Sequence, residues 1–488
     1  MGREEQIIGE RKKKIEELKK TGINPYPYKF DKKNDVAECL KLKPNVEVKT
    51  AGRIMSSRNL GKIIFAKLRD STGDIQIVFQ DRETPKKEFE LFKKYIDSGD
   101  FAGIEGKIIK TKTGEHSILV KKIELLSKSI LPLPEKWHGL SDKEERYRKR
   151  YLDLIMNPEV KEVFEKRQKI IDIIREFLKK DKFLEVETPS LQPLYGGAEA
   201  RPFITELFAL KMKLYLSISP EIYLKKLLVG GIERVFTICK NFRNEGIDRW
   251  HNPEFTMIEI YASYWDYNDI KKMTEQLIER LAKDITGGTI VDYQEKKINF
   301  KGPYKTMKFF DSIKKFAKID ACNEKVLKKE CGKLGFNGTR EQMIQFLFDE
   351  KVQPQLIQPT FIIDYPKEIC PLTKEHRLKE GEVERFELFV NGTELANAYT
   401  ELNDPIEQEK KLKDQLKGKG KLEKFEAHFE ANVIDEDFIN AMNYGMPPAG
   451  GIGIGIDRLT LFLTNQPSIR DVILFPFMKP EDNKGGGK

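Results

Sequence analysis

The chain has 488 residues, of which 34% are charged, and its formal net charge is +9. This length suggests about two to four domains with ample core, and the basic balance suits a polyanionic partner without identifying one. The sequence has no apolar span long enough for a membrane and no secretory signal, and Glu4, Glu5 and Glu10 argue against an organellar transit peptide.

The five cysteines form an odd, scattered set with no Cys-x-x-Cys pair: Cys39, Cys239, Cys322, Cys331 and Cys370. This pattern indicates neither a disulfide framework nor a zinc site. We therefore expect a cytoplasmic protein in a reducing compartment, with no membrane association.

Residues 1–45 are predicted to hold a basic helix over residues 10–20 that ends at Thr21-Gly22. A solvated helix and a contact with RNA both fit this composition. The pattern then changes to five short alternating strands over residues 46–126, with one helix near residues 89–96. Five strands with one helix predict a small OB-type β-barrel, a fold used for single-stranded nucleic acid.

A linker is predicted over residues 127–150, because Leu131-Pro132-Leu133-Pro134 begins a charged stretch. Residues 151–488 follow as a second, larger domain. Its early part contains residues 183–189, which read as a passage from a helix to a strand ending in Pro189.

A helical insertion is predicted around residues 267–380 of this domain. Helical periodicity is clear at residues 271–281 and 341–348, and a strand is predicted at 361–364. We assign no chemistry to this region. The lysine-rich run 410–424 favours a solvated helix and loop over a binding site.

A polar hairpin is the most informative motif of the larger domain. Arg243 and Glu245 leave the same face of an extended run, and three side chains of the next run share one face: Phe255, Glu259 and Tyr261. Residues 246–252 read as the connecting loop of an antiparallel hairpin. The apolar Ile258 and Ile260 take the opposite face. This arrangement collects a cation, carboxylates and an aromatic ring on one surface, which suits a nucleotide.

A second hairpin presents two more carboxylates. Asn391-Gly392 is a strong signal for a two-residue turn after the strand 385–390. Such a turn pairs Glu387 with Ala396 and Glu394 with Phe389, so both carboxylates project from one face and are able to share Mg²⁺. Strict alternation, however, sends Glu394 and Asn397 to opposite faces. We therefore predict a β-bulge near Ala396.

The third motif is an apolar run with glycine at every second position, Gly451-Ile452-Gly453-Ile454-Gly455, followed by Arg458. It lacks the Lys-Ser/Thr pair of a Walker loop and the βαβ setting of a dinucleotide fingerprint. Alternating glycines instead strip one strand face of side chains, so that a flat ligand can lie against the sheet. Taken alone, the run favours a close-packed core strand with a surface arginine over a ligand site.

Together, these motifs resemble the second and third signature motifs of the class II aminoacyl-tRNA synthetases, and residues 183–189 resemble the first. The resemblance implies an α+β protein with an antiparallel-sheet catalytic domain that activates an amino acid with ATP. It assigns Arg243 to the α-phosphate and the amino-acid carboxylate, Glu245 to the adenine amino group and His251 to the distal phosphates. Phe255 and Arg458 would sandwich the adenine. The first motif lies at the family's dimer interface, which implies a homodimer.

The remaining residues carried over by this resemblance fall into three sets. The expected ATP site comprises Arg243, Asn244, Glu245, His251, Asn252, Phe255, Glu387, Leu388, Gly455, Ile456, Asp457 and Arg458. The expected catalytic residues are Arg243, Arg458, Glu387 and Glu394, of which Glu387 and Glu394 would hold Mg²⁺. Three barrel residues match those that read the anticodon in the lysine, aspartate and asparagine subgroup: Arg58, Phe65 and Gln76.

The resemblance narrows to the lysine-specific branch at residues 196–198, 219–225 and 391–404. By resemblance the lysine site comprises Gly197, Glu221, Arg243, Glu259, Tyr261, Asn397 and Glu401. The charges agree, because two ammonium groups require carboxylates, whereas an aspartate pocket requires extra cations. Glu221 and Gly197 would serve the α-amino group, and Glu401 and Tyr261 the side-chain ammonium.

The expected function is therefore ATP-dependent activation of L-lysine and its transfer to the 3′ end of tRNA(Lys). Two alternatives stay open: an aspartate- or asparagine-specific relative, and a non-catalytic RNA-binding descendant. The carboxylates argue against the first, and the intact Arg243, Glu387, Glu394 and Arg458 argue against the second. Membership of a multi-synthetase assembly is not decidable from the sequence.

Overall fold

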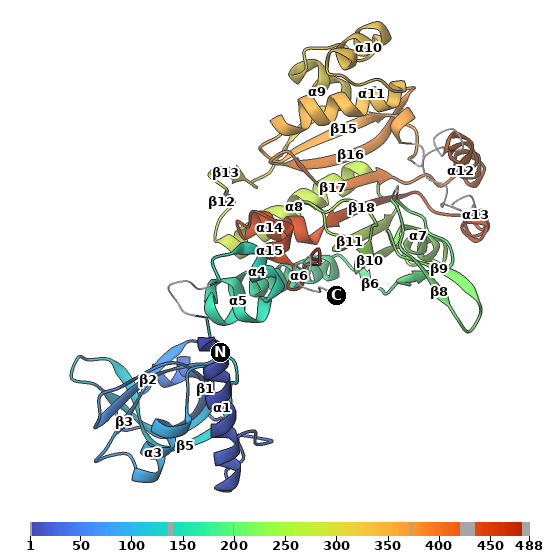
Figure 1. Ribbon diagram of the computed structural model, residues 1–488. Coiled ribbons are helices and arrows are strands. Elements are labelled where there is room, and N and C mark those ends of the chain that lie inside the picture. Colours follow the sequence, from blue (N-terminus) through green and yellow to red (C-terminus); the bar gives the residue numbers. More distant parts are fainter. Residues whose placement is uncertain (1, 135–139, 199, 371–372, 420–434, 481–488) are drawn as a thin grey trace. The chain divides into compact units, whose positions relative to one another are not determined.

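The computed structural model describes residues 2–134, 140–198, 200–370, 373–419 and 435–480. The chain divides into two compact units, residues 1–141 and residues 142–488, and most of their elements are labelled in Figure 1. Both units combine strands with helices, which confirms the expected α+β class.

The first unit is built around a closed five-stranded barrel in the order β1-β2-β3-β5-β4. Its strands are β1 (Glu47–Asn59), β2 (Ile63–Arg69), β3 (Asp74–Gln80), β4 (Phe101–Lys110) and β5 (His116–Ser127), and α3 (Lys86–Tyr95) connects β3 to β4. Alternate residues point inward, as Ile64, Ala66 and Leu68 of β2 illustrate. The predicted OB-type barrel and its single helix are confirmed.

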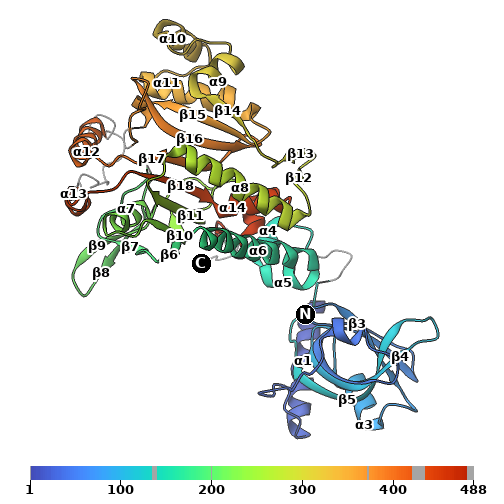
Figure 2. The same ribbon diagram turned by 180° about the vertical axis from the view of Figure 1, so that it is seen from behind.

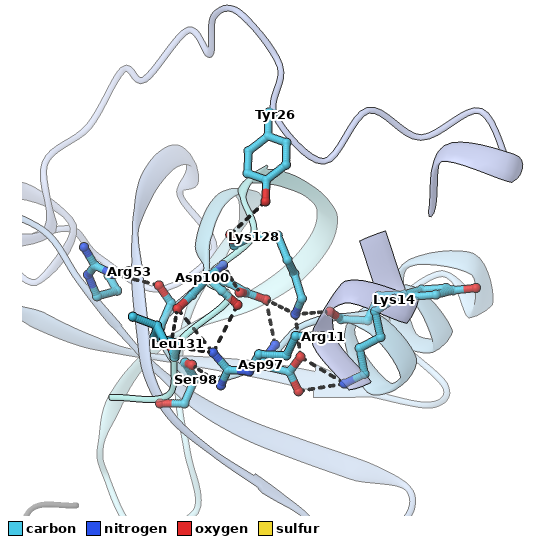
Figure 3. A network of polar contacts seen from close by, with 12 residues as sticks. Arg11, Lys14, Tyr26, Arg53, Asp97, Ser98, Asp100, Lys128 and Leu131 are labelled. Atoms are coloured by element: carbon cyan, nitrogen blue, oxygen red, sulfur yellow. Dashed lines mark hydrogen bonds and ion pairs between the residues drawn. The ribbon is translucent and has the colours of Figure 1, made fainter. Parts of the chain in front are cut away.

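The amino-terminal helix α1 (Arg3–Lys20) begins earlier than predicted and ends at Thr21, as predicted. A short helix α2 (Val36–Cys39) follows. The inner side of α1 is not solvated: Leu18 and Arg11 are buried. The Arg11 guanidinium donates to the backbone carbonyls of Ser98 and Leu131 at 2.9 Å (Figure 3). Helix α1 is thereby fixed to the segment around β4 and β5.

Residues 142–150, expected to belong to the linker, form part of the second unit. They include α4 (Lys143–Arg148) and the first residue of α5 (Arg150–Met156). Arg150 is 1% exposed and donates to the carbonyl oxygens of Leu474 at 3.0 Å and Arg470 at 2.8 Å. A buried guanidinium with backbone acceptors binds this stretch to the end of the second unit. Residues 135–139 of the expected linker lie outside the described residues.

An eight-stranded sheet dominates the second unit in the order β14-β15-β16-β17-β18-β11-β10-β6. The strands are β6 (Leu184–Glu185), β10 (Arg234–Phe242), β11 (Glu254–Ser263), β14 (Lys305–Lys308), β15 (Thr360–Pro366), β16 (Glu382–Val390), β17 (Thr393–Thr400) and β18 (Ala449–Gly455). Pairing is antiparallel from β15 to β10 and parallel only at the two edges.

One face of this sheet is covered by α6 (Pro158–Lys180), α8 (Tyr267–Thr286) and α14 (Ile456–Leu463). Figure 2 shows α8 lying along β16, β17 and β18. The main core forms between these helices and apolar side chains of the sheet, including the predicted inward residues Ile258 and Ile260, both 0% exposed. The opposite face carries the polar side chains together with two smaller apolar clusters.

Smaller elements complete the second unit. A three-stranded sheet comprises β7 (Leu191–Gln192), β8 (Ile204–Leu207) and β9 (Met212–Leu216), and β12 (Ile290–Tyr293) pairs with β13 (Lys296–Asn299). The other helices are α7 (Glu221–Val229), α9 (Phe309–Phe316), α10 (Glu324–Lys333), α11 (Arg340–Leu347), α12 (Pro405–Lys419), α13 (Glu436–Asn443) and α15 (Ile469–Val472).

The local predictions for residues 267–380 are confirmed by α8, α11 and β15, which cover the expected helices and strand. The helix expected in the lysine-rich run is α12, and residues 420–424 of that run lie outside the described residues. All five cysteines are free, as expected. In the part of the chain that the structure describes, no helix has the length and apolar character needed to cross a bilayer.

Candidate active site

Four neighbouring strands place a row of functional groups across the open face of the sheet. Glu387 of β16 pairs with Asn397 of β17, Asn397 with Gly453 of β18, and Gly453 with Glu259 of β11. Residues paired across adjacent strands project to the same face. The glycine in the middle of the row therefore leaves a bare strip of backbone between polar side chains from β17 and β11.

A β-bulge sets this row and corrects one predicted pairing. Glu394 lies opposite Phe389, as predicted, but the register then shifts so that Leu388 faces Ala396 and Glu387 faces Asn397. Glu387 is therefore not opposite Ala396. The predicted bulge is confirmed, since the extra residue, Leu395, turns Glu394 and Asn397 to the same face. Without it, one of these two side chains would enter the core.

The alternating glycines of β18 are required because side chains of neighbouring residues lie directly against their Cα atoms. A Cβ atom at Gly453 would lie 2.9 Å from the Met257 methyl group, and one at Gly451 would overlap the Glu401 carboxylate and the Tyr261 ring. The isoleucines between them, Ile452 and Ile454, belong to the core on the other face. The glycine run is thus both a core strand and the bare floor of the polar face.

An acidic pocket lies beside this floor. Glu259 is 4% exposed and accepts hydrogen bonds from the Ser219 hydroxyl at 2.8 Å and the Tyr261 hydroxyl at 3.1 Å. Glu401 is 1% exposed, and its Oε2 lies 2.6 Å from the Lys225 ammonium. Glu221, at the start of α7, places its Oε1 2.6 Å from the same ammonium. Three carboxylates from β11, α7 and the end of β17 therefore converge.

Burial disfavours the ionised form of these carboxylates unless further cations are present. Desolvation raises the pKa of Glu259 to about 8, and the Glu221 charge adds to the shift. Desolvation also raises the pKa of Glu401 to about 7, with repulsion from Glu221 adding and Lys225 opposing. The Oε1 atom of Glu401 is buried without a hydrogen-bond partner among the described residues. The pocket is therefore suited to a cationic ligand.

Gly197 closes the pocket near Glu221. Its φ of +81° is a left-handed conformation that favours glycine. A Cβ atom there would lie 2.9 Å from the Glu221 Cβ and 3.0 Å from the Ser219 hydroxyl. Asn397 lies in the row between Glu387 and Gly453, and it accepts a hydrogen bond from the Arg385 guanidinium at 3.2 Å. The structure thus brings the predicted lysine-site residues to one region.

Two arginines, Arg243 and Arg458, lie at the other end of the bare strip formed by the glycines of β18. Arg243 follows β10, and its guanidinium lies 5.1 Å from the centre of the Phe255 ring. Its Nε is buried and has no hydrogen-bond partner in the described parts of the chain, and desolvation lowers its pKa. Arg458, in the first turn of α14, lies 3.0 Å from the His251 imidazole and donates to the Glu394 carbonyl at 2.7 Å. This end is suited to phosphate and carboxylate groups.

The other predicted ATP residues differ in what their side chains can do. Asn244 and Glu245 are exposed on the loop, where Glu245 accepts from the Arg201 amide at 3.2 Å. Leu388 and Ile456 lie in the core, so only their backbone faces a ligand. Two more side chains are engaged internally. Asn252 donates to the Glu254 carbonyl at 2.6 Å, and Asp457 accepts from the Thr256 amide at 2.7 Å.

The predicted cation ligands Glu387 and Glu394 lie on one face. Glu387 accepts a hydrogen bond from the Tyr365 hydroxyl at 2.7 Å and forms an ion pair with Arg385. Burial raises the pKa of Glu387 to about 7, with Arg385 opposing and repulsion from Glu394 adding. Among the described residues, no group of three His, Cys, Asp or Glu side chains is placed so that it could hold a metal ion by itself. The pair fits a magnesium ion that takes its other ligands from phosphate and water.

Sequence reasoning missed the groups that hold the carboxylates in place: Ser219, Lys225, Tyr365 and Arg385. A signal existed for Lys225, which lies four residues after Glu221 and therefore on the same side of a helix. Arg385 had a comparable signal, two positions before Glu387 on the same strand face. No such signal existed for Tyr365, because it reaches Glu387 from a strand distant in sequence.

In the first unit, Arg58, Phe65 and Gln76 lie on β1, β2 and β3. Arg58 pairs with Phe65, and Gln76 with Lys67, so the side chains share one face. Phe65 is half-buried and lies outside the buried barrel core, which argues against the alternative that it merely fills that core. Gln76 donates to Glu115 at 2.8 Å and accepts from the Ser117 hydroxyl at 2.9 Å. An aromatic ring and polar groups are thereby presented on the barrel's outer surface.

Comparisons with known proteins agree with both units. Residues 142–479 match the family described as tRNA synthetases class II (D, K and N), and residues 48–126 match the OB-fold nucleic acid binding domain. The chain is 50% identical over 476 residues to lysine–tRNA ligase 2 of Methanosarcina mazei, covering 94% of this chain and 92% of that protein. It is 48% identical over 490 residues to a lysine–tRNA ligase of Carboxydothermus hydrogenoformans, covering 98% and 99%.

Proposed function

The chain belongs to the class II tRNA synthetases of the aspartate, lysine and asparagine group, and from this premise we propose that it activates L-lysine with ATP and transfers it to tRNA(Lys). The proteins that it resembles along nearly their whole length carry the name lysine–tRNA ligase. The observation that carries the assignment of substrate is the buried acidic pocket of Glu221, Glu259 and Glu401.

The pocket selects its amino acid by charge. A substrate with two ammonium groups supplies the cations that Glu259 and Glu401 need for ionisation, since both have raised pKa values. We place the side-chain ammonium at Glu401 and Tyr261, and the α-amino group at Glu221 and Gly197. An aspartate or asparagine side chain would leave the buried carboxylates without a cation, which is costly. This argues against a relative specific for either amino acid.

In this proposal the bare glycine strip of β18, together with Arg243 and Arg458, forms the ATP site. Arg243 binds the α-phosphate and the lysine carboxylate, so the two reacting groups meet at one guanidinium. Its unpartnered Nε supports this role. Arg458 and Phe255 hold the adenine between them, Glu245 accepts from its amino group, and His251 binds the distal phosphates. Lysine carboxylate then attacks the α-phosphate and pyrophosphate leaves.

Rate enhancement comes from position and charge. No side chain acts as a nucleophile, because the substrate's own carboxylate attacks. Arg243 and Arg458 orient the phosphates and neutralise charge that develops on them. Glu387 and Glu394 would hold Mg²⁺, which neutralises phosphate charge when bound. Tyr365 and Arg385 fix the Glu387 carboxylate for that purpose.

The first unit supplies recognition of tRNA. We propose that Phe65 stacks on an anticodon base while Arg58 and Gln76 read its edge. The outward positions of these side chains on adjacent barrel strands support this assignment. The net charge of +9 suits a phosphate backbone as partner.

We also propose that the protein works as a cytoplasmic homodimer. Apolar side chains are exposed next to the first motif, where Leu184 is 51% and Leu191 is 50% exposed. Exposed apolar groups at that place suit a two-fold interface. Sedimentation of a fully active monomer would contradict the proposal.

The decisive experiment is ATP–pyrophosphate exchange with each of the twenty amino acids. Lysine alone is expected to support fast exchange without tRNA. Exchange with aspartate or asparagine would assign the chain to another member of the group. Absence of exchange with every amino acid would leave a non-catalytic RNA-binding protein as the better interpretation.

A further inference from the structure

Lys225 occupies the centre of the acidic pocket, and the proposed function gives it no role. It lies on α7, is 3% exposed, and its ammonium is 2.6 Å from both Glu221 Oε1 and Glu401 Oε2. A cation of the protein thus already bridges the two carboxylates that are proposed to bind the two ammonium groups of the substrate. Its position calls for a functional explanation.

The two oxygens of the Glu401 carboxylate have different surroundings because Lys225 binds one of them. Oε2 is held by Lys225, whereas Oε1 is buried without a partner in the described residues. Oε1 lies over Gly451, at a place where a Cβ atom would overlap it. Lys225 therefore fixes the rotation of the carboxylate so that one oxygen faces the protein and the other faces the bare floor.

The bridge also sets the charge of the pocket. The ionised carboxylates of Glu221, Glu259 and Glu401 carry three negative charges, and Lys225 cancels one of them. Two negative charges remain, which equals the number of ammonium groups on lysine. Without Lys225 the pocket would hold one excess charge even with lysine bound. Buried charge without a counter-charge is disfavoured, and a carboxylate would respond by keeping a proton.

We propose that Lys225 is a positioning and specificity-determining residue that aims the free oxygens of Glu401 and Glu221 at the substrate and matches the pocket's charge to a diammonium ligand. This inference rests on the proposed function and deepens it. The opposite role is that Lys225 competes with the substrate ammonium and must leave before lysine binds. The two roles predict opposite effects of removing its charge.

The test compares Lys225→Met with Lys226→Met in the full chain. Methionine keeps the apolar stem and removes the ammonium. Lys226 is a matched control, because it is the next residue of α7, is 21% exposed, and pairs at 2.7 Å with Asp437, which is 86% exposed. ATP–pyrophosphate exchange is measured from pH 6.5 to 9, varying lysine and ATP separately.

Lys225→Met is expected to raise the lysine KM at least about tenfold at neutral pH, as when one member of a buried charge pair is removed. The ATP KM should change far less. The lysine KM of the variant should recover as pH rises, because the carboxylates then ionise. Among the described residues, the titratable groups that face Glu401 in the variant are Glu221, Tyr261 and, through Tyr261, Glu259. A purely structural defect would not produce this pH shift. Lys226→Met should leave all of these quantities near the wild-type values.

A double-mutant cycle tests whether Lys225 acts through Glu401. In a Glu401→Gln background, Lys225→Met should add much less to the lysine KM than it does in the wild-type chain, because the two residues are coupled. Additive effects would overturn the proposal, as would an unchanged or lowered lysine KM in Lys225→Met. Lys225→Gln, which keeps hydrogen-bond donors, replaces Lys225→Met where that variant does not fold.

Failure of both Lys225 variants to fold, with Lys226→Met intact, would make Lys225 a scaffold residue and would also overturn the proposal. Failure of the proposed function gives a different result: the wild-type chain would then show no lysine-dependent exchange at all. The wild-type control therefore separates the two.

Discussion

Each unit buries a lysine between two carboxylates, and the two clusters differ in how far their charges are balanced. In the first unit, Lys128 is 0% exposed and binds Asp97 and Asp100, while Lys14 supplies a second ammonium to Asp97 (Figure 3). In the second unit, Lys225 binds Glu221 and Glu401 with Glu259 close by. The first cluster has two cations for two anions, and the second has one for three.

Hydrogen bonding follows the same division. In the first cluster, Asp100 accepts from Lys128 at 2.7 Å and from the Ser129 amide at 2.8 Å, and Asp97 accepts from Lys14. In the second, Glu401 Oε1 has no partner among the described residues. Both clusters are buried, so burial alone does not separate a scaffold from a binding site. The second cluster is distinguished as a binding site by its excess of carboxylates over cations and by Glu401 Oε1, which has no partner among the described residues.

The pKa values show what the imbalance does to the carboxylates. Burial opposes ionisation of Asp97, but the Lys128 and Lys14 ammonium groups outweigh it and lower its pKa. Burial raises the pKa of Asp100, which lies deeper. Burial also raises the pKa of Glu401 to about 7, with Lys225 opposing, and that of Glu259 to about 8, with two hydrogen bonds and the Arg243 charge opposing. A cationic substrate would complete the second cluster as Lys14 completes the first.

The largest loss of stability is expected when the first cluster loses its buried lysine. Lys128→Met leaves the buried Asp100 and the half-buried Asp97 short of a cation and should destabilise the first unit by about 3–5 kcal/mol. Chemical unfolding of the full chain measures this loss. Lys122→Met is the control, because Lys122 is 59% exposed and should matter little. Equal stability of the two variants would remove the scaffold role of Lys128.

Removing a negative charge from the second cluster should impair lysine activation rather than stability. Glu401→Gln should impair lysine activation by about 2–5 kcal/mol, because the substrate ammonium loses its charge partner. Thermal unfolding should change far less than for Lys128→Met, since Lys225 keeps its ion pair with Glu221 when the Glu401 charge is removed. ATP–pyrophosphate exchange with varied lysine and varied ATP measures the effect. Unchanged kinetic constants for lysine would place Glu401 outside the pocket.

The barrel offers a further contrast between its interior network and its outer face. Phe65→Ala should weaken tRNA recognition by about 1–3 kcal/mol, the usual scale of one aromatic–base stack. Exchange without tRNA should stay near the wild-type rate, and aminoacylation at subsaturating tRNA should fall. Added salt should weaken wild-type tRNA binding through counterion release. A large loss of barrel stability without a change in anticodon recognition would argue for a structural role.

The dependence of the lysine KM on pH tests whether the carboxylates of the second cluster are short of cations. The pKa values of Glu401 and Glu259 are about 7 and about 8, so both carboxylates gain protons as pH falls through this range. The lysine KM should therefore rise as pH falls from 8 to 6, approaching about tenfold per pH unit for one protonation. The ATP KM should vary less.

Asp97 of the first cluster should respond in a lower pH range than the carboxylates of the second cluster. The folded-state pKa of Asp97 lies below its ordinary value, so its contribution to stability is present above that value and is lost only as pH falls below it. A lysine KM that is flat between pH 6 and 8 would contradict the view that the second cluster is short of cations.

Local sequence patterns determined much of the fold. Strict alternation predicted the barrel strands and the polar and apolar faces of β10 and β11, because strand parity depends only on neighbouring residues. The glycine run predicted a bare strand face for the same reason. The conflict between Glu394 and Asn397 even indicated the bulge in β17. Resemblance to a known family, rather than pattern, supplied the role of each site residue.

Tertiary structure decided where charges meet. The pairing of Glu387 with Asn397 required the position of the bulge, and the docking of Arg11 and the burial of Arg150 required segments far apart in the sequence. The balance around Lys128 and the imbalance around Lys225 likewise depend on elements that meet only in the folded unit. Side-chain direction is a local property of the backbone, whereas the net charge of a buried cluster is a sum over elements that the sequence alone does not bring together.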